Sequence, residues 1–163
     1  MTKQGATADD LKYLDRATEL ARNGIRGGEG GPFGAVIVKD GSIIAEGWNQ
    51  VTSDLDPTAH AEVNAIRRAC AETGSFSLEG ATLYSICEPC AMCLGAIYWA
   101  RLDRLVFANT RQEAAAIGFD DLLIYTEIPK PVDKRKLPTL HVPNAEARAV
   151  FAEWLAKPDK VRY

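Results

Sequence analysis

The feature that most limits how this chain can fold is the regular change in the spacing of its apolar residues. Helical spacing opens the chain, strand-like runs follow, and the two kinds of segment then alternate. The segments expected to be helices are residues 8–23, 58–72, 89–100, 111–117 and 145–156, and those expected to be strands are residues 33–38, 42–46, 81–87, 105–108 and 122–125.

The order of these segments predicts the arrangement of the sheet. Asp40-Gly41 stands between the first two strand-like runs, and an Asp-Gly pair in that place is a strong signal for an antiparallel hairpin. Later strands that alternate with helices are expected to pair in parallel, with helices on both faces. We therefore expect an α/β fold of three α/β/α layers, with a mixed sheet of about five strands.

The length and the cysteines indicate one domain with a metal or redox site. A chain of 163 residues, 47% of them hydrophobic, fits a single globular domain over residues 1–163 that needs no disulfide. Three of its four cysteines, Cys87, Cys90 and Cys93, lie in one short segment, which in a reducing, cytoplasmic compartment favours metal or redox chemistry over cross-linking. The amino terminus lacks the features of a secretory signal, and no segment is apolar enough to span a bilayer.

The charge argues for a small-molecule partner. A net charge of −3 argues against a long nucleic acid as the main partner, because affinity for nucleic acids depends on clustered Lys and Arg. The run Lys134-Arg135-Lys136 is most simply a solvated loop. We therefore expect no membrane and no nucleic acid among the partners.

The candidate metal ligands stand where two expected helices begin. His60 lies in the first turn of one helix, and Pro89 opens the other, which carries Cys90 and Cys93. Helices that start at the same edge of a sheet bring one imidazole and two thiols within reach of one ion. Three protein ligands leave one position open, as in catalytic zinc sites. The alternative is a closed structural site in which Cys87 is the fourth ligand, although Cys87 is more simply a buried residue at a strand end.

Glu62 is the residue expected to transfer protons at this metal site. Water on zinc becomes a nucleophile near neutral pH when a neighbouring group takes and later redelivers its proton, and Glu62 can do this. Its spacing from His60 does not place the two side chains on one helical face. His-x-Glu followed by Pro-Cys-x-x-Cys is nevertheless the signature of zinc-dependent deaminases, whose Glu is not a ligand.

Several segments resemble the bacterial guanine deaminases of the cytidine deaminase fold. They are GGPFGAVIVKDG, HAEVNAIRRAC, CEPCAMCLGAIYWAR and GFDDLLIY, and the similarity runs from about Gly30 to Tyr163. The resemblance implies hydrolysis of guanine to xanthine and ammonia by a homodimer with one zinc ion per chain. Deaminases that edit adenosine in transfer RNA share His-Ala-Glu and Glu-Pro-Cys, so the expectation of guanine rests on the Gly-Phe-Asp-Asp segment.

Other site residues follow from this resemblance by matching position. It implies base contacts by Phe33, Asn49 and Asp121 or its neighbour Asp120, a pocket lid in Tyr163 and a second proton carrier in Glu127. Guanine offers N–H donors that a buried carboxylate can accept. Pro158 is expected to end the last helix, and the resemblance places the tail, about residues 158–163, over the active site of the partner subunit.

These residues also have simpler interpretations. Asp120 and Asp121 can cap a helix or a turn, Asn49 can be a turn residue, Phe33 can belong to the core, and Tyr163 can be a frayed end. The sequence also departs from the family pattern at Trp48, where a smaller or polar residue is expected, and at Val161-Arg162.

Two other functions share parts of this prediction. A deaminase of another substrate, such as a nucleoside, cytosine, an aminotriazine or a transfer-RNA adenosine, would have the same zinc site. A non-catalytic, zinc-stabilised binding module would hold the metal but release no ammonia, and the intact Glu62 argues against it.

Overall fold

The computed structural model describes residues 5–163, which separate into two compact units. One unit ends at Asp121, and the other is Leu122–Tyr163. The first unit holds every strand found in the described residues, and the second is built from helices and loops. The expectation of a single domain over residues 1–163 stays a prediction.

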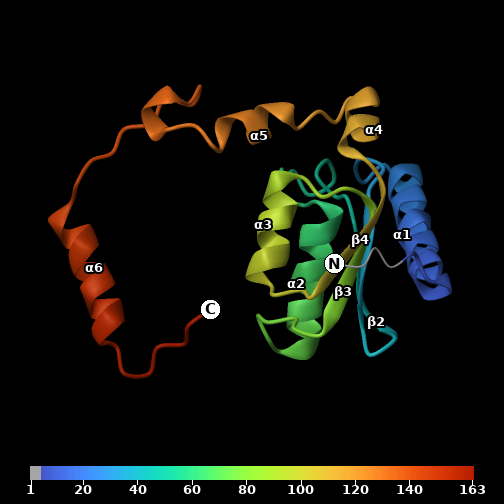
Figure 1. Cartoon of the computed structure of the whole chain (residues 1–163), viewed down its shortest axis with the longest axis horizontal. Helices are drawn as coiled ribbons and strands as arrows, with labels where there is room; N and C mark the ends of the chain where they lie inside the picture. The colour runs from blue at the N-terminus through green and yellow to red at the C-terminus, as the bar shows by residue number, and fades with distance from the viewer. Residues whose placement is uncertain (1–4) are drawn as a thin grey trace. The chain divides into compact units, whose positions relative to one another are not determined.

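A four-stranded mixed sheet forms the centre of the first unit (Figure 1). Its strands are β1 (Gly34–Lys39), β2 (Ser42–Trp48), β3 (Ala81–Cys87) and β4 (Arg104–Asn109), in the order β2-β1-β3-β4. β1 pairs antiparallel with both β2 and β3, whereas β3 and β4 are parallel. The mixed α/β sheet is confirmed, with four strands in place of about five.

The hairpin between β1 and β2 turns at Asp40-Gly41, as the sequence predicted. Both residues have positive φ angles, 50° for Asp40 and 75° for Gly41. Two successive positive φ angles are what a type I′ turn requires, and this turn matches the twist of the paired strands.

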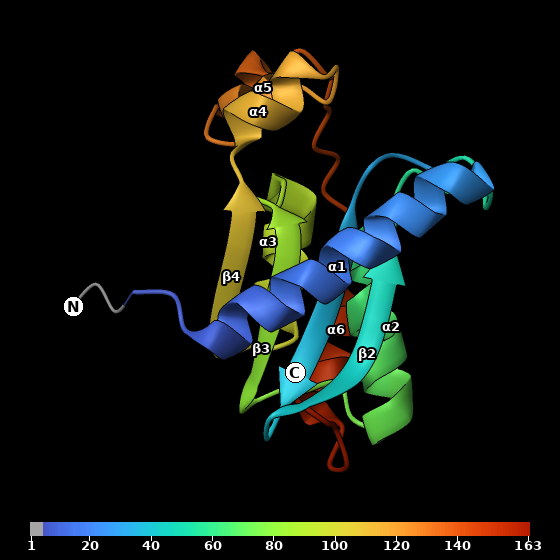
Figure 2. The ribbon, with the colours of Figure 1, turned by 90° about the vertical axis from the view of Figure 1, so that its right-hand side faces the viewer.

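Helices cover both faces of this sheet (Figure 2). α1 (Ala8–Gly27) lies on one face, and α2 (Ala61–Thr73) and α3 (Ala91–Trp99) lie on the other. Successive residues of a strand point to opposite faces. Leu83 in β3 accordingly belongs to the apolar cluster beneath α2 and α3, and its neighbour Tyr84 belongs to the cluster beneath α1. The three α/β/α layers are confirmed.

Two glycines let these helices lie close to the sheet. A Cβ atom added at Gly34 would lie 2.1 Å from the carbonyl oxygen of Ala17 in α1, and one at Gly47 would lie 2.2 Å from that of Ala61 in α2. Only glycine leaves room for such contact between backbones. The start of α2 is thereby held directly against β2.

Both helices that carry candidate metal ligands begin later than predicted. α2 begins at Ala61 with His60 as its N-cap, and not near residue 58. The Asp56 carboxylate instead accepts hydrogen bonds from the backbone and hydroxyl of Thr58, each at 2.7 Å, which closes a turn before the helix. α3 begins at Ala91 with Cys90 as its N-cap. His60 and Cys90 therefore hold matching positions at the two helix starts.

Residues 122–125, expected to form a strand, belong to a helix. α5 is Leu122–Glu127, and just beyond it the N–H of Ile128 donates to the carbonyl of Ile124 at 3.0 Å. Leu, Ile and Tyr fit a strand by residue preference. A strand needs a neighbour to complete its backbone hydrogen bonds, whereas a helix completes them locally, and the local solution is the one adopted here.

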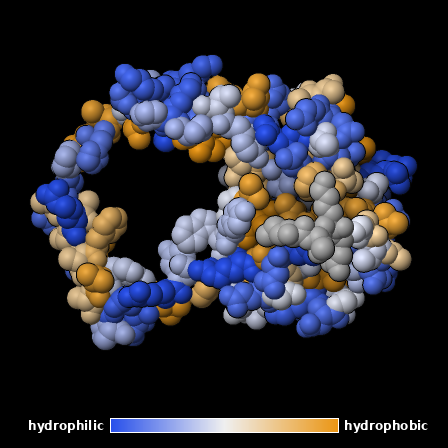
Figure 3. Space-filling view, in the orientation of Figure 1, coloured by the Kyte–Doolittle hydropathy of each residue, from blue (hydrophilic) through white to orange (hydrophobic). Residues whose placement is uncertain are grey.

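The remaining elements follow the predictions more closely. α4 (Arg111–Ala116) follows β4 in the first unit, and a capping box between Thr110 and Glu113 starts it. In the second unit, the run Lys134-Arg135-Lys136, expected to be a loop, begins at the last residue of the short 3₁₀ helix η1 (Val132–Lys134). α6 (Ala145–Ala156) has the predicted bounds, and apolar side chains lie at its surface (Figure 3). No helix within residues 5–163 has the length and apolar character that a membrane span requires.

Candidate active site

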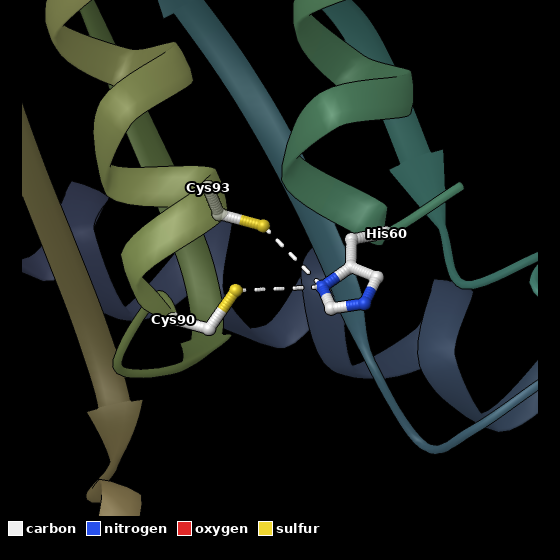
Figure 4. Close-up of side chains that lie close together, drawn as sticks. All are labelled: His60, Cys90 and Cys93. Carbon is white, nitrogen blue, oxygen red and sulfur yellow. Dashed lines mark hydrogen bonds between the residues drawn. The ribbon is translucent and has the colours of Figure 1, made fainter. Parts of the chain in front are cut away.

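Three side chains meet between the starts of α2 and α3 (Figure 4). The Sγ atoms of Cys90 and Cys93 lie 3.7 and 3.4 Å from Nδ1 of His60. All three ligand atoms are within 4.8 Å of one another, and Cys93 is fully buried. In the part of the chain that the structure describes, this is the one group of three or more His, Cys, Asp and Glu residues able to hold a metal ion.

These separations fit a zinc ion. Zinc bonds of about 2.0 Å to a histidine nitrogen and about 2.3 Å to a thiolate, at the tetrahedral angle, put the two atoms about 3.5 Å apart. The distances from Nδ1 of His60 to the two sulfur atoms bracket this value. One imidazole and two thiolates also form a ligand set that zinc favours.

The two thiols carry opposite shifts in pKa. The Cys93 thiol donates to Cys90, and this contact, aided by His60, lowers the pKa of Cys90 to about 4. The same contact, together with burial, raises the pKa of Cys93. The hydrogen bond with Cys90 raises the pKa of His60. Cys90 is therefore ready to bind a cation as a thiolate, and a bound divalent cation favours the thiolate of Cys93 too.

Glu62 lies beside this cluster, which its sequence spacing alone did not establish. Its side chain is buried in the first turn of α2, and Oε1 accepts a hydrogen bond from the Ser85 hydroxyl at 3.1 Å. The carboxyl also contacts the Cys93 thiol. Burial raises the pKa of Glu62, so the group holds a proton more readily than an exposed glutamate.

Cys87 is separate from the three clustered ligands. It is buried at the end of β3, and its thiol donates to the carbonyl of Thr110 at 3.8 Å. Burial raises its pKa to about 11, which favours the neutral thiol. The three-ligand arrangement is therefore the better supported of the two alternatives that the sequence left open.

Asn49 and Phe33 meet in the loops beside α2. Asn49 is 5% exposed, and its backbone N–H donates to the carbonyl of Phe33 at 3.0 Å. The Phe33 ring packs edge-on against Phe119, with centroids 4.8 Å apart. This contact brings the Gly-Phe-Asp-Asp segment against the loop that carries Phe33.

Asp121 is tied to the loop that carries Cys90. Nε of Arg111 donates to its carboxylate at 3.1 Å, and the backbone N–H of Arg111 donates to Glu88 at 3.2 Å. The N–H of Glu88 in turn donates to the carbonyl of Asn109 at 2.8 Å. Asp120, by comparison, is exposed. Of the two adjacent carboxylates, Asp121 is the one held in a partly buried position.

A cavity of about 290 Å³ opens at the same edge of the sheet. It is lined by Pro32, Phe33, Ile86, Cys87, Asn109, Glu113, Ala114 and Ile117. Its wall includes the predicted base contact Phe33 but not the metal cluster. Its lining is mainly apolar, and Asn109 and Glu113 are its polar and charged members.

Glu127 and Tyr163 belong to the second unit. Glu127 ends α5, and its carboxylate accepts hydrogen bonds from the Lys130 ammonium and the backbone of Lys136. Lys130 lowers the pKa of Glu127. Tyr163 is 70% exposed at the chain end. The site roles expected of both residues stay predictions.

Two residues that contact the predicted site residues, Ser85 and Arg111, are not evident from the sequence alone. Ser85 has no motif around it, and its contact with Glu62 joins residues 23 positions apart. The sequence predicts Arg111 at the start of a helix, but nothing in the sequence indicates that it pairs with Asp121. Both contacts arise from the fold.

Comparison with known proteins gives one family. Residues 7–109 match the cytidine and deoxycytidylate deaminase zinc-binding region. The chain is 52% identical to guanine deaminase from Bacillus subtilis over 93% of its own length and 97% of that protein. It is 44% identical to tRNA-specific adenosine deaminase from Haemophilus influenzae, over 69% of this chain and 68% of that protein.

A solved structure agrees with these sequence matches. The X-ray structure of guanine deaminase from Bacillus subtilis superimposes with a TM-score of 0.91, covering 94% of this chain and 98% of that one. The family match spans more than half of the described chain and includes His60, Glu62, Cys90 and Cys93. The chain therefore belongs to the zinc-dependent cytidine and deoxycytidylate deaminase family.

Proposed function

We propose that this protein is a zinc-dependent guanine deaminase that hydrolyses guanine to xanthine and ammonia. The observation that carries the proposal is the buried carboxyl of Glu62 beside the group formed by His60, Cys90 and Cys93. The choice of guanine rests on the 52% identity to a guanine deaminase over nearly the full length of both chains.

In this proposal His60, Cys90 and Cys93 hold one zinc ion per chain. When bound, zinc lowers the pKa of a water molecule so that it can act as a nucleophile near neutral pH. Three protein ligands would leave the ion able to bind that water as well. Their placement at helix starts favours the thiolate forms, because the positive end of the helix dipole lies there.

Glu62 is the proton carrier of the reaction. It takes a proton as oxygen adds to C2 of guanine, and it gives a proton to the exocyclic nitrogen as the C2–N bond breaks and ammonia leaves. Its raised pKa suits a group that must both accept and return a proton. Ser85 holds one carboxyl oxygen through its hydroxyl, which orients the group.

The base contacts are assigned to Asn49, Phe33 and Asp121. Phe33 supplies an apolar ring for the flat base, and Asn49 supplies a buried amide. The carboxylate of Asp121 can accept from the N–H groups of guanine, which adenine does not match in the same arrangement. Asp120 is the weaker candidate of the pair because it is exposed.

We further propose that both units form one deaminase domain that acts as a homodimer. In this arrangement the tail of one protomer, about residues 158–163, covers the active site of its partner, and Tyr163 is the lid. A small flat base needs such a cover if bulk water is to be kept out during the reaction. Glu127 is proposed as a second proton carrier.

The decisive experiment measures ammonia release from guanine, guanosine, adenine, cytosine and a transfer-RNA adenosine. Wild-type protein should release ammonia from guanine at the highest kcat/KM and carry about one zinc per chain. Release from a different substrate at a higher kcat/KM would replace guanine but keep the family. Failure to release ammonia from any of them would favour the zinc-stabilised binding module.

A matched pair of cysteine variants tests the ligand set in the same assay. Cys90→Ala should lose both zinc and turnover because it removes a proposed ligand. Cys87→Ala makes the same change three residues earlier and should keep both, with a modest loss of stability. Loss of zinc from Cys87→Ala would instead support the closed four-ligand site.

A further inference from the structure

Four side chains around Asn49 form a closed ring, which we call the Trp48 clamp: Glu29, Trp48, Gln50 and Arg68. Nε1 of Trp48 donates to Glu29 at 2.7 Å, and the amide of Gln50 donates to the same oxygen at 3.4 Å. Arg68 closes the ring, because it donates to Oε1 of Gln50 at 2.6 Å and lies 4.3 Å from the centroid of the Trp48 ring. The clamp joins the loop after α1, the end of β2 and the body of α2.

The amide of Asn49 is fixed in one orientation inside this clamp. Its Oδ1 accepts hydrogen bonds from the backbone N–H groups of Gly31 at 3.1 Å and Val51 at 3.2 Å. Two backbone donors identify this end of the amide as the oxygen, and they use both of its lone pairs. Nδ2 donates to no group within residues 5–163 of the structure. The amide therefore meets a ligand as a hydrogen-bond donor.

The clamp holds the two backbone segments that supply these donors. Gly31 lies two residues after Glu29, and Val51 directly follows Gln50. The backbone of Glu29 is itself bonded to the second segment, because its carbonyl accepts from the N–H of Ser53 at 3.0 Å. Loss of a clamp contact would therefore loosen the donors that orient Asn49.

The clamp also fixes Asn49 relative to the metal cluster. The N–H of Gln50 donates to the carbonyl of Ala59 at 2.9 Å, directly before His60. Space around the amide is tight, since a Cβ atom added at Gly30 would lie 2.2 Å from Oδ1 of Asn49. Small displacements of either loop would therefore move Nδ2 relative to the metal ligands.

We propose that Trp48 is a positioning residue that sets the affinity and selectivity for the base by holding the Asn49 amide in place. The inference rests on the proposed deaminase function. The clamp residues are neither proposed metal ligands nor the proposed proton carrier, so they act on substrate binding and not on the chemical step. The ligand class that this amide recognises is a base that presents a carbonyl oxygen or a ring-nitrogen lone pair to Nδ2.

The test is a steady-state comparison of Trp48→Phe with wild type. Phe keeps an aromatic ring beneath Arg68 but cannot donate to Glu29. For guanine, or for whichever substrate of the panel the wild type converts best, KM should rise about tenfold, the worth of one hydrogen bond, while kcat and zinc content change less than about twofold.

A double-mutant cycle shows whether the effect passes through Asn49. Asn49→Ala alone should raise KM, and Trp48→Phe added to it should raise KM no further, because the amide that the clamp positions is gone. A merely structural role of Trp48 would lower stability and active fraction equally in both backgrounds and leave KM unchanged.

Two arginines that both bond Glu46 give a matched control. Arg68 donates to its backbone carbonyl at 2.8 Å, whereas Arg16 binds its carboxylate at 2.6 and 2.8 Å outside the clamp. Arg68→Met should raise KM, and Arg16→Met should not. An unchanged KM in Trp48→Phe, or equal KM effects with and without Asn49, would overturn the clamp. A wild type inactive on every substrate would overturn the proposed function and the clamp with it.

Discussion

Each face of the sheet buries one carboxylate, and the two carboxylates are held in opposite ways. Asp10 belongs to the first turn of α1, on one face, and Glu62 belongs to the first turn of α2, on the other; both are at most 5% exposed. Arg104 donates to both oxygens of Asp10, at 2.7 and 3.0 Å, and lowers its pKa. Within residues 5–163 no Lys or Arg bonds Glu62, and burial raises its pKa. Asp10 is therefore held in its ionised form by the charge of Arg104, whereas Glu62 can exchange a proton.

Two neighbouring residues of β3 each donate a hydroxyl hydrogen bond to one of these carboxylates. The Tyr84 hydroxyl donates to Asp10 at 2.9 Å on one face, and the Ser85 hydroxyl donates to Glu62 at 3.1 Å on the other. Because successive side chains of a strand point to opposite faces, a single strand serves both layers. The comparison teaches that a buried carboxylate is structural when a fixed cation holds it and is available for chemistry when only neutral groups and a metal site surround it.

Replacing Glu62 is expected to have the largest effect. Glu62→Gln keeps the shape and the contact with Ser85 but cannot accept a proton, so kcat should fall by about 10²- to 10⁴-fold or more. Zinc content should be unchanged, and the melting temperature should be equal to or above that of wild type, because a buried carboxyl without a cation is removed. Metal analysis, calorimetry and ammonia release check the three quantities. Turnover within tenfold of wild type would remove Glu62 from the mechanism.

Replacing Asp10 should give the reverse pattern. Asp10→Asn leaves Arg104 without its partner and weakens the capping box with Thr7, so the free energy of unfolding should fall by about 3 kcal/mol. This value is at the lower end for broken buried pairs because 49% of the Arg104 side chain is exposed. Turnover per zinc should stay within about twofold of wild type.

The pH dependence of this loss has a definite sign. The pKa of folded Asp10 lies below its ordinary value of 3.8, so its stabilising contribution is complete above that pH and declines as pH falls. Urea unfolding at several pH values should therefore show the gap between wild type and Asp10→Asn closing below about pH 4. A constant gap would mean that the loss comes from packing and not from charge.

Much of the fold and the centre of the site could be predicted from sequence because both depend on local patterns. The spacing of apolar residues predicted the three α/β/α layers. The residues His60, Glu62, Cys90 and Cys93 lie in two short motifs. The geometry now places Glu62 beside Cys93, which spacing alone left open. The proposed roles of the base contacts, by comparison, still rest on the resemblance.

The errors and omissions share a physical cause. Residues 122–125 have strand-like composition but form α5, because pairing depends on a neighbouring strand that composition does not reveal. The Trp48 clamp joins residues from three separate segments, and the departure at Trp48 could be noticed in the sequence but not explained. Contacts between distant residues require the fold, and they decide how the site is oriented.

The smallest change that tests the difference between Asp10 and Glu62 removes one hydroxyl on each face of β3. Tyr84→Phe removes the donor to Asp10 but leaves the ion pair with Arg104, so stability should fall by about 1 kcal/mol while kcat/KM stays within about twofold of wild type. Ser85→Ala removes the donor that orients Glu62, so kcat/KM should fall by about tenfold with a similar or smaller loss of stability. Each variant serves as the control for the other, because the two residues are adjacent in one strand. Each hydroxyl donates one hydrogen bond to a buried carboxylate and accepts one longer bond at 3.4 Å. Equal effects on kcat/KM in the two variants would mean that β3 transmits disturbance to the site regardless of face, and the division between a structural and a catalytic carboxylate would then be wrong.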